Sequence, residues 1–361
     1  MKKSLFTLSI LCLLAISASA TIRRVNPSAG IAGANVYTTV LLAVTAAVAN
    51  DTIQLEPFGV AQSNYNENIT ITKKLTFLGV GYNLTNNQLV SPPAKKEWCY
   101  LQSITFNNGS ANSSVIGLMV GTVYIYAPNV IVDRCIAGIT LGKSTNTISA
   151  VYSYGNNAII TRCWLTSGIQ SLNYAPDIIT GTFISNNIIY GQVSNLLNAV
   201  IKNNFLFQVS SVGSYHTNVD NSSMTNNIYE GIINGATIFA IEDIASSSGN
   251  SYGYNLVTSY NLLPVGNGNI NGADVTSIFV DNNVFNYQSQ YLQMEQGINL
   301  ASGSPAIAAG SGGIDMGPLG GTTPYIKSGL PPYPIITSAV NSGLGNATVP
   351  LNVNVSIRSN N

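Results

Sequence analysis

A short phrase recurs along the chain: a hydrophobic step, two asparagines, then a second hydrophobic step. It is clearest in "ISNNIIYG" (184–191), "IKNNFLFQ" (201–208) and "MTNNIYEG" (224–231). Recurrence of one phrase every few tens of residues is typical of folds built from stacked repeat units. This feature therefore favours a solenoid over an ordinary globular domain.

The second asparagine of each phrase marks one position per repeat, which we name the ladder position. Cysteine or leucine takes this position in earlier copies, and weaker copies of the phrase follow later. The predicted ladder residues are Leu118, Cys135, Cys163, Asn187, Asn204, Asn227, Asn255 and Asn283. Their unequal spacing excludes a strict leucine-rich repeat and fits coils of short strands joined by turns of variable length.

Asparagine suits such a position for two physical reasons. It tolerates a left-handed backbone at a bend between strands, and its amide carries both a donor and an acceptor. When coils stack at the roughly 4.8 Å spacing of paired strands, each buried amide donates to one neighbour and accepts from the other. A lone buried amide would instead cost about 1–3 kcal/mol. The repeat therefore predicts an asparagine ladder within an all-β, parallel solenoid.

The cysteines fit the same scheme. Cys135 and Cys163 fall at the ladder position of adjacent coils, so their α-carbons should lie near the separation that a disulfide permits. We predict stacked free thiols, because small apolar side chains already fill the position. A disulfide that leaves Cys99 unpaired is the alternative. The chain has no CxxC or Cys/His cluster, so the sequence predicts no zinc site.

The first twenty residues, "MKKSLFTLSILCLLAISASA", have the layout of a secretory signal peptide that is cleaved after Ala20. We therefore expect a secreted or cell-surface protein. No later stretch approaches the roughly 20 apolar residues that a membrane helix needs, so membrane insertion is not expected.

Charged side chains are scarce, at 8% of the residues, where soluble domains carry about 25%. Basic and acidic residues balance at 14 each, which argues against nucleic acid as a partner. The hydrophobic content of 45% favours a packed β core over disorder.

The ends of the repeat region also carry signals. "TTVLLAVTAAVAN" (38–50) places Val40, Leu41, Val44, Ala47 and Val48 at helical spacing, which predicts a short helix that caps the first coil. The expected organisation is a signal peptide (1–20), an N-terminal strand and capping helix (21–50), a parallel β-helix (51–321), and a proline-containing linker with a C-terminal strand (322–361).

Three segments carry a resemblance to a known family. "NDTIQLEPFG" and "ENITITKKLTFLGVGYN" resemble the opening coil of secreted bacterial proteins of the pectin-lyase-like superfamily, and "GSPAIAAGSGGIDMGPLGG" (303–321) resembles the end of many bacterial β-helices. The resemblance implies a right-handed parallel β-helix of about nine or ten coils. The chain is similar to a group of secreted bacterial β-helix proteins without assigned activity. Enzymes of this superfamily mostly act on acidic polysaccharides.

Candidate catalytic groups do not gather in the sequence. Asp133 and Asp281 share a repeat position, but about 29 Å would separate them at the spacing of stacked coils. Glu242 and Asp243 are adjacent acids that we interpret as a solvated loop, and His216 is expected to be a loop histidine without catalytic partners. The sequence therefore predicts no catalytic residue, metal or cofactor.

Two sets of residues are candidates for ligand binding. Arg134 and Arg162 both precede a ladder position and should point outward about 5 Å apart on neighbouring coils, as a polyanion contact or as plain surface. The pairs Tyr124/Tyr126 and Tyr152/Tyr154 each share one face of a strand, as sugar-stacking rings would.

The function expected from these patterns is that of a secreted, non-catalytic protein that binds a polysaccharide or cell-surface glycan, or serves as an extracellular scaffold or adhesin. The alternative is a polysaccharide lyase or glycoside hydrolase that acts on acidic polysaccharide. The patterns leave the oligomeric state open.

Overall fold

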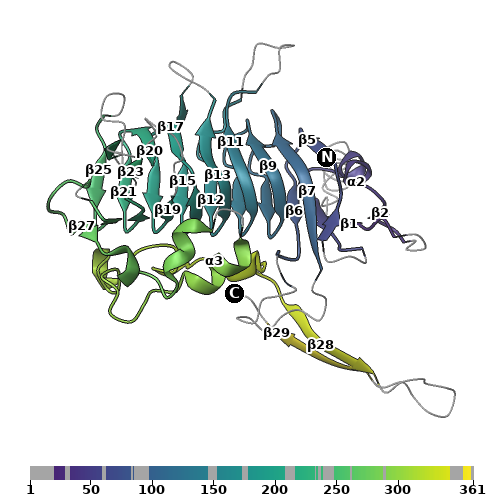
Figure 1. Ribbon diagram of the computed structural model, residues 1–361. Helices are drawn as coiled ribbons and strands as arrows, with labels where there is room; N and C mark the ends of the chain where they lie inside the picture. Colours follow the sequence, from purple (N-terminus) through teal and green to yellow (C-terminus); the bar gives the residue numbers. More distant parts are fainter. Residues whose placement is uncertain are drawn as a thin grey trace, which may run out of the picture.

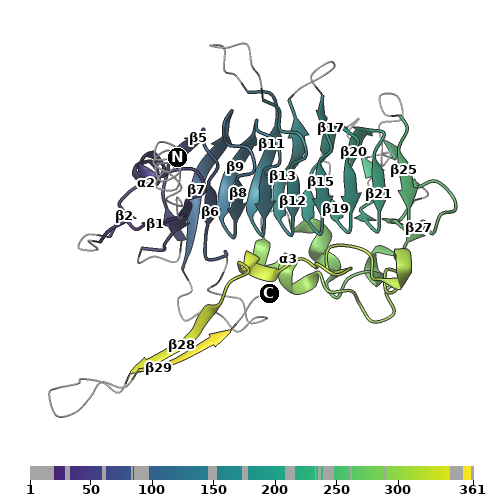
Figure 2. The same cartoon turned by 180° about the vertical axis from the view of Figure 1, so that it is seen from behind.

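The computed structural model describes residues 20–28, 33–58, 62–82, 84, 97–144, 153–172, 178–207, 216–231, 233–234, 237–238, 248–260, 262–287, 290–341 and 353–358. Over these residues the chain is all-β, with two long sheets of parallel strands and few helices (Figure 1 and Figure 2). This arrangement is compatible with the expected parallel β-helix.

The first sheet has eleven strands, and from β1 onward their order in the sheet follows the chain. Most of these strands are three or four residues long. In sheet order they are β2 (Val36–Tyr37), β1 (Ile22–Val25), β3 (Thr52–Leu55), β6 (Thr76–Leu78), β8 (Ser114–Ile116), β10 (Ile131–Asp133), β12 (Ile159–Thr161), β15 (Phe183–Ser185), β18 (Val200–Lys202), β21 (Ser223–Thr225) and β25 (Ser251–Gly253).

The second sheet has fourteen strands, and from β6 to β13 consecutive strands alternate between the two sheets. Its main path runs through β27 (Ile270–Ala273), β26 (Leu256–Thr258), β22 (Ile228–Tyr229), β19 (Phe205–Phe207), β16 (Ile188–Tyr190), β13 (Trp164–Ser171), β11 (Ile136–Leu141), β9 (Met119–Ile125), β7 (Trp98–Phe106) and β4 (Gln62–Asn64). Its branches are β5 (Asn68–Ile71), β14 (Ile179–Thr180), β17 (Val193–Leu197) and β20 (Thr217–Asp220).

The core lies between the sheets and is built from residues in register. From β3 onward, the second residue of each strand in the first sheet points inward, and these residues stack from coil to coil as Ile53, Phe77, Val115, Val132, Ile160, Ile184, Ile201, Met224 and Tyr252. Eight of these nine side chains are apolar and all are at least 92% buried. The alternation of apolar and polar residues in each strand thus supplies one continuous hydrophobic column.

The helix expected near the N-terminus is present as α2 (Val40–Ala46), and it packs against β1, β2, β3 and β5. It is shorter than the 38–50 segment, and its buried face differs from the predicted one. Ala43 and Ala47 are buried, whereas Leu41 and Val48 are more than half exposed. Ala47 has an extended backbone conformation, so the helix ends before Val48 and Val48 does not lie on its buried face.

Both ends of α2 are fixed by side chains of one coil. The two carboxylate oxygens of Glu67 accept hydrogen bonds from the Val40 and Leu41 N–H groups, each at 2.9 Å. At the other end, Lys73 Nζ donates to the carbonyls of Val44 and Ala47. An acid at the helix N-terminus and a cation at its C-terminus both complement the helix dipole.

After β27, short helices replace the parallel strands among the described residues. Residues 274–330, which we name the return segment, contain η1 (Val275–Ser277), η2 (Asn282–Asn286), α3 (Tyr291–Gly297), η3 (Ser311–Gly313) and η4 (Lys327–Gly329). In both views this segment lies along one long side of the stacked strands (Figure 1 and Figure 2). The last parallel strand among the described residues is β27, so the coiled region is shorter than the predicted 51–321.

The return segment packs against the outer face of the second sheet. Phe279 and Phe285 lie with their ring centroids 4.9 and 5.3 Å from that of Phe205. The residues of the second sheet buried in this outer cluster are Ile136, Trp164, Ile188, Phe205, Phe207, Ile228 and Leu256. These side chains alternate with the core residues of the same strands, so both faces of this part of the sheet are buried.

A two-stranded antiparallel hairpin, β28 (Ile335–Asn341) and β29 (Val353–Arg358), projects from the end of the return segment (Figure 1). It corresponds to the expected C-terminal strand, but residues 322–330 are packed rather than a free linker, since Tyr325 and Leu330 are almost fully buried. Within the described part of the chain, no helix is long and apolar enough to cross a membrane.

Candidate functional site

A continuous row of neutral polar side chains crosses the second sheet, one from each of seven neighbouring strands. We name it the polar row, and in register it consists of Thr70, Thr105, Tyr124, Thr140, Gln170, Ser194 and Asn218. Thr70 and Gln170 are exposed, Ser194 is buried, and the other four are partly buried. At the spacing of paired strands, about 4.8 Å, the row presents one hydroxyl or amide group per strand.

Strand alternation explains why the row faces outward. The preceding residues of the same strands form a buried row that faces the core, namely Ile69, Ile104, Val123, Ile139, Ile169, Val193 and Thr217. A side chain next to a buried one on a strand points to the opposite face.

Glycine bulges separate the polar row from the part of the sheet under the return segment. The pairing of β11 slips by one residue against β9 and by two residues against β13, close to Gly138. Side chains are not tolerated at these bulges: a Cβ at Gly121 would lie 2.6 Å from the Gln102 carbonyl, and one at Gly168, which has φ +73°, would lie 2.1 Å from the Gln192 carbonyl. On their outer face, the long strands β9, β11 and β13 therefore carry apolar side chains before the bulge and polar ones after it.

Tyr124 and Tyr126 lie together as the sequence predicts. Their ring centroids are 6.1 Å apart with planes inclined by 39°, and both rings are partly exposed at the end of β9. Burial, with a smaller effect of Tyr124, raises the pKa of Tyr126, so its hydroxyl stays a neutral donor at physiological pH.

The second tyrosine pair is described only in part. Tyr154 is half-buried against the core, and Lys143 Nζ lies 5.7 Å from its ring centroid. The segment beside it is close to the first pair, because Ser153 Oγ donates to the Tyr126 carbonyl. Tyr152 lies outside the described residues.

The arginine pair differs from the expectation. Arg162 forms a bidentate ion pair with Asp133, with both N–O distances at 2.8 Å, and its side chain is 23% exposed. Arg134 is buried, and its Nη1 donates to the Leu330 carbonyl at 2.6 Å. The two arginines therefore do not form an exposed pair, because the return segment covers Arg134 and Asp133 pairs with Arg162.

The two arginines nevertheless share a backbone feature with the asparagines. The residue before each ladder position has a left-handed conformation, with φ between 54° and 58° at Arg134, Arg162, Asn186, Asn203, Asn226 and Tyr254. Burial, with the nearby charge of Arg162, lowers the pKa of Arg134. At Arg134, Asn186, Asn203 and Asn226 this turn directs a side chain to the return segment, whereas Arg162 pairs with Asp133.

The ladder itself is formed by direct hydrogen bonds between side-chain amides. Asn187 Nδ2 donates to Asn204 Oδ1, Asn204 Nδ2 to Asn227 Oδ1, and Asn227 Nδ2 to Asn255 Oδ1, each at 3.0 Å. Every one of these side chains is fully buried. The ladder then continues to Asn269, to which Asn255 donates at 3.3 Å.

Asn283, the last predicted ladder residue, is elsewhere. It is exposed in η2, where its N–H and Nδ2 both donate to Asp281 Oδ1. This prediction is wrong because the phrase "DNN" forms the capped start of a 3-10 helix here and not a bend between strands.

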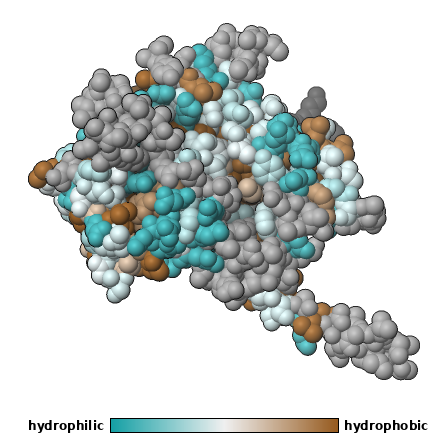
Figure 3. All heavy atoms as spheres, viewed as in Figure 1, coloured by the Kyte–Doolittle hydropathy of each residue, from teal (hydrophilic) through white to brown (hydrophobic). Residues whose placement is uncertain are grey.

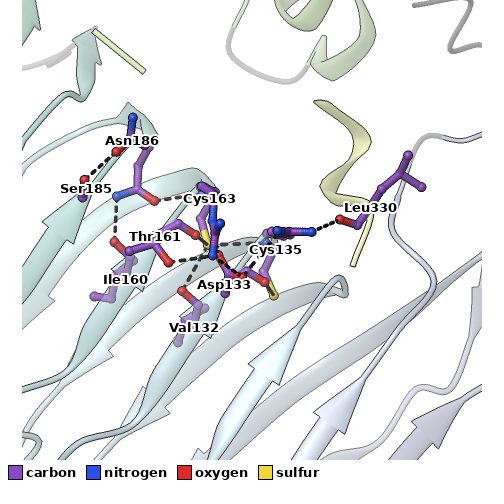
Figure 4. A network of polar contacts seen from close by, with 12 residues as sticks. Val132, Asp133, Cys135, Ile160, Thr161, Cys163, Ser185, Asn186 and Leu330 are labelled. Atoms are coloured by element: carbon purple, nitrogen blue, oxygen red, sulfur yellow. Dashed lines mark hydrogen bonds and ion pairs between the residues drawn. The ribbon is translucent and has the colours of Figure 1, made fainter. Parts of the chain in front are cut away.

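Cys135 and Cys163 take the ladder position as free, buried thiols, as predicted, and Cys99 is also free (Figure 4). Cys163 Sγ accepts from the Cys135 N–H at 3.4 Å and contacts the Thr161 carbonyl at 3.1 Å as a donor. Asn204 makes the same pattern of bonds, to the Asn187 N–H and the Lys202 carbonyl. A thiol thus replaces an amide here, and burial raises the pKa of Cys163 well above its usual value.

The described ionisable residues nearest in sequence to Asn218 are Asp220 and His216. Asp220, two residues beyond Asn218 on β20, accepts hydrogen bonds from Ser248 N–H and Oγ. His216 is buried, with Nε2 at 2.7 Å from the Glu230 carbonyl, and burial lowers its pKa to about 4. His216 thus lies at a bend just before β20, as a loop histidine would, but its side chain is buried.

The adjacent acids Glu242 and Asp243 lie outside the described residues. Within the described ranges no group of three or more His, Cys, Asp or Glu side chains could hold a metal ion. Glycoside hydrolysis commonly uses two carboxylates about 5–10 Å apart across the scissile bond. The polar row itself contains no carboxylate.

Comparisons with models of protein families, with curated proteins and with solved structures found no match. The chemistry of the site is therefore judged from its own geometry. Sequence patterns located Tyr124 and Tyr126 but missed the rest of the polar row. The visible signal was strand alternation in "NITIT", "TVYIY" and "GITLG", which marks each outward residue without showing that they align.

Proposed function

We propose that the protein is a secreted, non-catalytic β-helix protein that binds an uncharged glycan along the polar row. The proposal includes a right-handed parallel β-helix of about nine or ten coils, related to the pectin-lyase-like superfamily, and export directed by the first twenty residues. The observation that carries it is the polar row, a set of seven aligned neutral side chains that includes the Tyr124 ring and lies beside the partly exposed Tyr126 ring.

The chemistry of the row suits a neutral sugar chain. Hydroxyl and amide groups both donate and accept hydrogen bonds, as sugar hydroxyls do. The Tyr124 and Tyr126 rings offer apolar faces for the C–H side of a pyranose. The space-filling view is consistent with a surface of this kind, since apolar residues lie in separate patches among hydrophilic and neutral ones (Figure 3).

The direction of the row suggests how a glycan would lie. The seven side chains run across the strands, along the stack of coils, so an extended chain would contact one strand after another. The lack of a carboxylate in the row favours an uncharged ligand, and the buried Arg134 and paired Arg162 remove the expected anion contact.

The test is binding to insoluble and soluble polysaccharides, neutral and acidic, by the chain that starts at Thr21. We expect retention on a neutral polysaccharide that persists in 1 M salt, where the Debye length falls to about 3 Å, and no release of sugar products. Tyr124→Ala and Gln170→Ala should each weaken retention several-fold.

Tyr190→Ala is the matched control, because Tyr190 is also a partly buried tyrosine of the second sheet but packs toward the return segment. Equal losses for Tyr124→Ala and Tyr190→Ala would point to a general structural effect and contradict the proposed site. Release of unsaturated or reducing sugars from an acidic polysaccharide would favour a lyase or hydrolase instead.

A further inference from the structure

A buried carboxylate lies at the N-terminal edge of the first sheet. The Asp51 side chain has no exposed surface, and its oxygens accept three hydrogen bonds. Oδ1 accepts from the Thr21 nitrogen at 2.8 Å, and Oδ2 accepts from Arg23 Nε at 2.6 Å and from the Val48 N–H at 2.9 Å. Burial raises the pKa of Asp51, but these hydrogen bonds and the Arg23 charge lower it below its usual value.

The backbone holds the Thr21 nitrogen in this place. The Thr21 carbonyl accepts from the Thr52 N–H at 2.9 Å, and the next residue begins β1, which pairs in parallel with β3 from Ile22 and Thr52 onward. The contact with Asp51 is therefore a consequence of strand pairing and not of a free chain end.

Thr21 is also the residue that follows the predicted cleavage site. Hydrolysis of the Ala20–Thr21 peptide bond adds one water: the Ala20 carbonyl becomes a carboxylate, and the Thr21 nitrogen becomes an amine that takes up a proton below its pKa. An amide that makes one hydrogen bond would thus become a cation with three N–H donors at the same position.

We propose that the α-ammonium group created at Thr21 forms a buried ion pair with Asp51, so that removal of the signal peptide stabilises the first coil. Charge-assisted hydrogen bonds are roughly twice as strong as neutral ones, and truncation of one partner of a buried pair is strongly destabilising. The inference is independent of the glycan-binding proposal.

Among the described residues, few other charged groups lie where they could compete with the Thr21 amine for Asp51. Arg23 on β1 is the second cation on Asp51, and its Nη1 also donates to Tyr37 Oη on β2 at 2.7 Å. The sequences of β3 (TIQL) and α2 (VLLAVTA), which pack at this edge, contain no ionisable side chain. A further cation, Lys73, lies nearby, since its Nζ donates to the Ala47 carbonyl, next to the Val48 N–H that donates to Asp51. The new amine would share the Asp51 carboxylate with Arg23.

The experiment compares two chains, each released from a removable N-terminal fusion: one starts at Thr21 and one keeps Ala20. Ala20 moves the amine by one residue and leaves an amide at Thr21. At pH 7 we expect the chain that starts at Thr21 to melt several degrees higher. In the Asp51→Asn background this difference should disappear.

The pH dependence gives an independent readout. The ordinary pKa of an α-amino group is about 7.7–8.0, and an ion pair raises it in the folded state. The added stability should therefore be complete below about pH 7.7 and be lost as the pH rises through the higher folded value. NMR titration of the ¹⁵N-labelled Thr21 amine measures that value directly.

Two outcomes would overturn the proposal: an α-amino pKa at or below its ordinary value in the folded protein, or a melting difference that is the same with and without Asp51. If Asp51→Asn does not fold in either form, the titration of the wild-type amine alone decides.

Discussion

Replacement of Asn204 by alanine tests the asparagine ladder at its centre. The Asn204 side chain is fully buried, and its Oδ1 accepts from both the N–H and the Nδ2 of Asn187, at 2.9 and 3.0 Å. Its own Nδ2 donates to Asn227 Oδ1 and to two backbone carbonyls. Alanine removes all of these bonds and adds none.

The loss follows from the groups left without partners. The Asn187 N–H loses its acceptor in a fully buried site, whereas Asn187 Nδ2 keeps its hydrogen bond to the Ile160 carbonyl at 2.9 Å. A buried group left without a partner costs about 1–3 kcal/mol. Asn227 Oδ1 keeps one hydrogen bond, from the backbone N–H of residue 204 at 2.9 Å. The free energy of unfolding should therefore fall by about 1–3 kcal/mol, mostly from the stranded Asn187 N–H.

Urea denaturation of the chain that starts at Thr21 measures this change. Asn68→Ala is the matched control, because Asn68 is an exposed strand asparagine whose Oδ1 accepts one hydrogen bond, from Ser103 Oγ. Its effect should stay within about 0.5 kcal/mol. Asn204→Cys should cost less than Asn204→Ala, since Cys163 shows that a thiol at this position both accepts and donates. Equal midpoints for Asn204→Ala and Asn68→Ala would refute the ladder as a source of stability.

Two further predictions concern buried groups. Burial raises the pKa of Glu295 to about 7, although Tyr325 Oη and the Ser328 N–H donate to it at 2.7 and 2.6 Å. Its protonated form therefore favours the folded state, and the unfolding free energy should fall by about 3 kcal/mol as the pH rises from about 4.5 to 7. Glu295→Gln should remove this part of the pH dependence, and an unchanged profile would contradict it. Thiol titration of the denatured, unreduced chain that starts at Thr21 should find three free thiols, whereas one thiol would mean that Cys135 and Cys163 form a disulfide.

Most of the ladder could be predicted from sequence because each copy of the repeated phrase is sufficient to identify its own ladder residue. An asparagine pair between two apolar steps encodes both the bend and the buried amide, whatever the loop that follows. The failure at Asn283 has the same origin. Asp281 caps the start of η2 by accepting from the Asn283 N–H, and the letters alone do not distinguish this cap from a bend. Asn269, the true next residue, lacks a preceding asparagine.

The outer surface was less predictable, because it depends on pairings between distant segments. Arg134 lies at an outward turn as expected, but Leu330, far along the chain, covers it. The polar row needs the register of seven strands, and the slips near Gly138 change that register by one residue against β9 and by two against β13. Alternation within a strand shows which residues face outward, but it does not show which of them lie side by side.

The asparagine pairs link the inside of the structure to its outside. In each pair the first asparagine has the left-handed backbone and the second forms the ladder. The first one also binds the return segment: Asn186 Nδ2 donates to the carbonyls of Pro318 and Gly320.

Two more first asparagines contact the return segment in the same way. Asn203 Nδ2 lies 3.5 Å from the Asp315 carbonyl, and Asn226 Oδ1 accepts from the Ser311 N–H at 2.9 Å. Glycine would adopt the same backbone more easily but has no side chain to make these bonds. The hydrogen bonds to the return segment therefore explain why asparagine rather than glycine occupies the first position. The repeated phrase thus encodes both the stacking of the coils and the packing of the return segment along them.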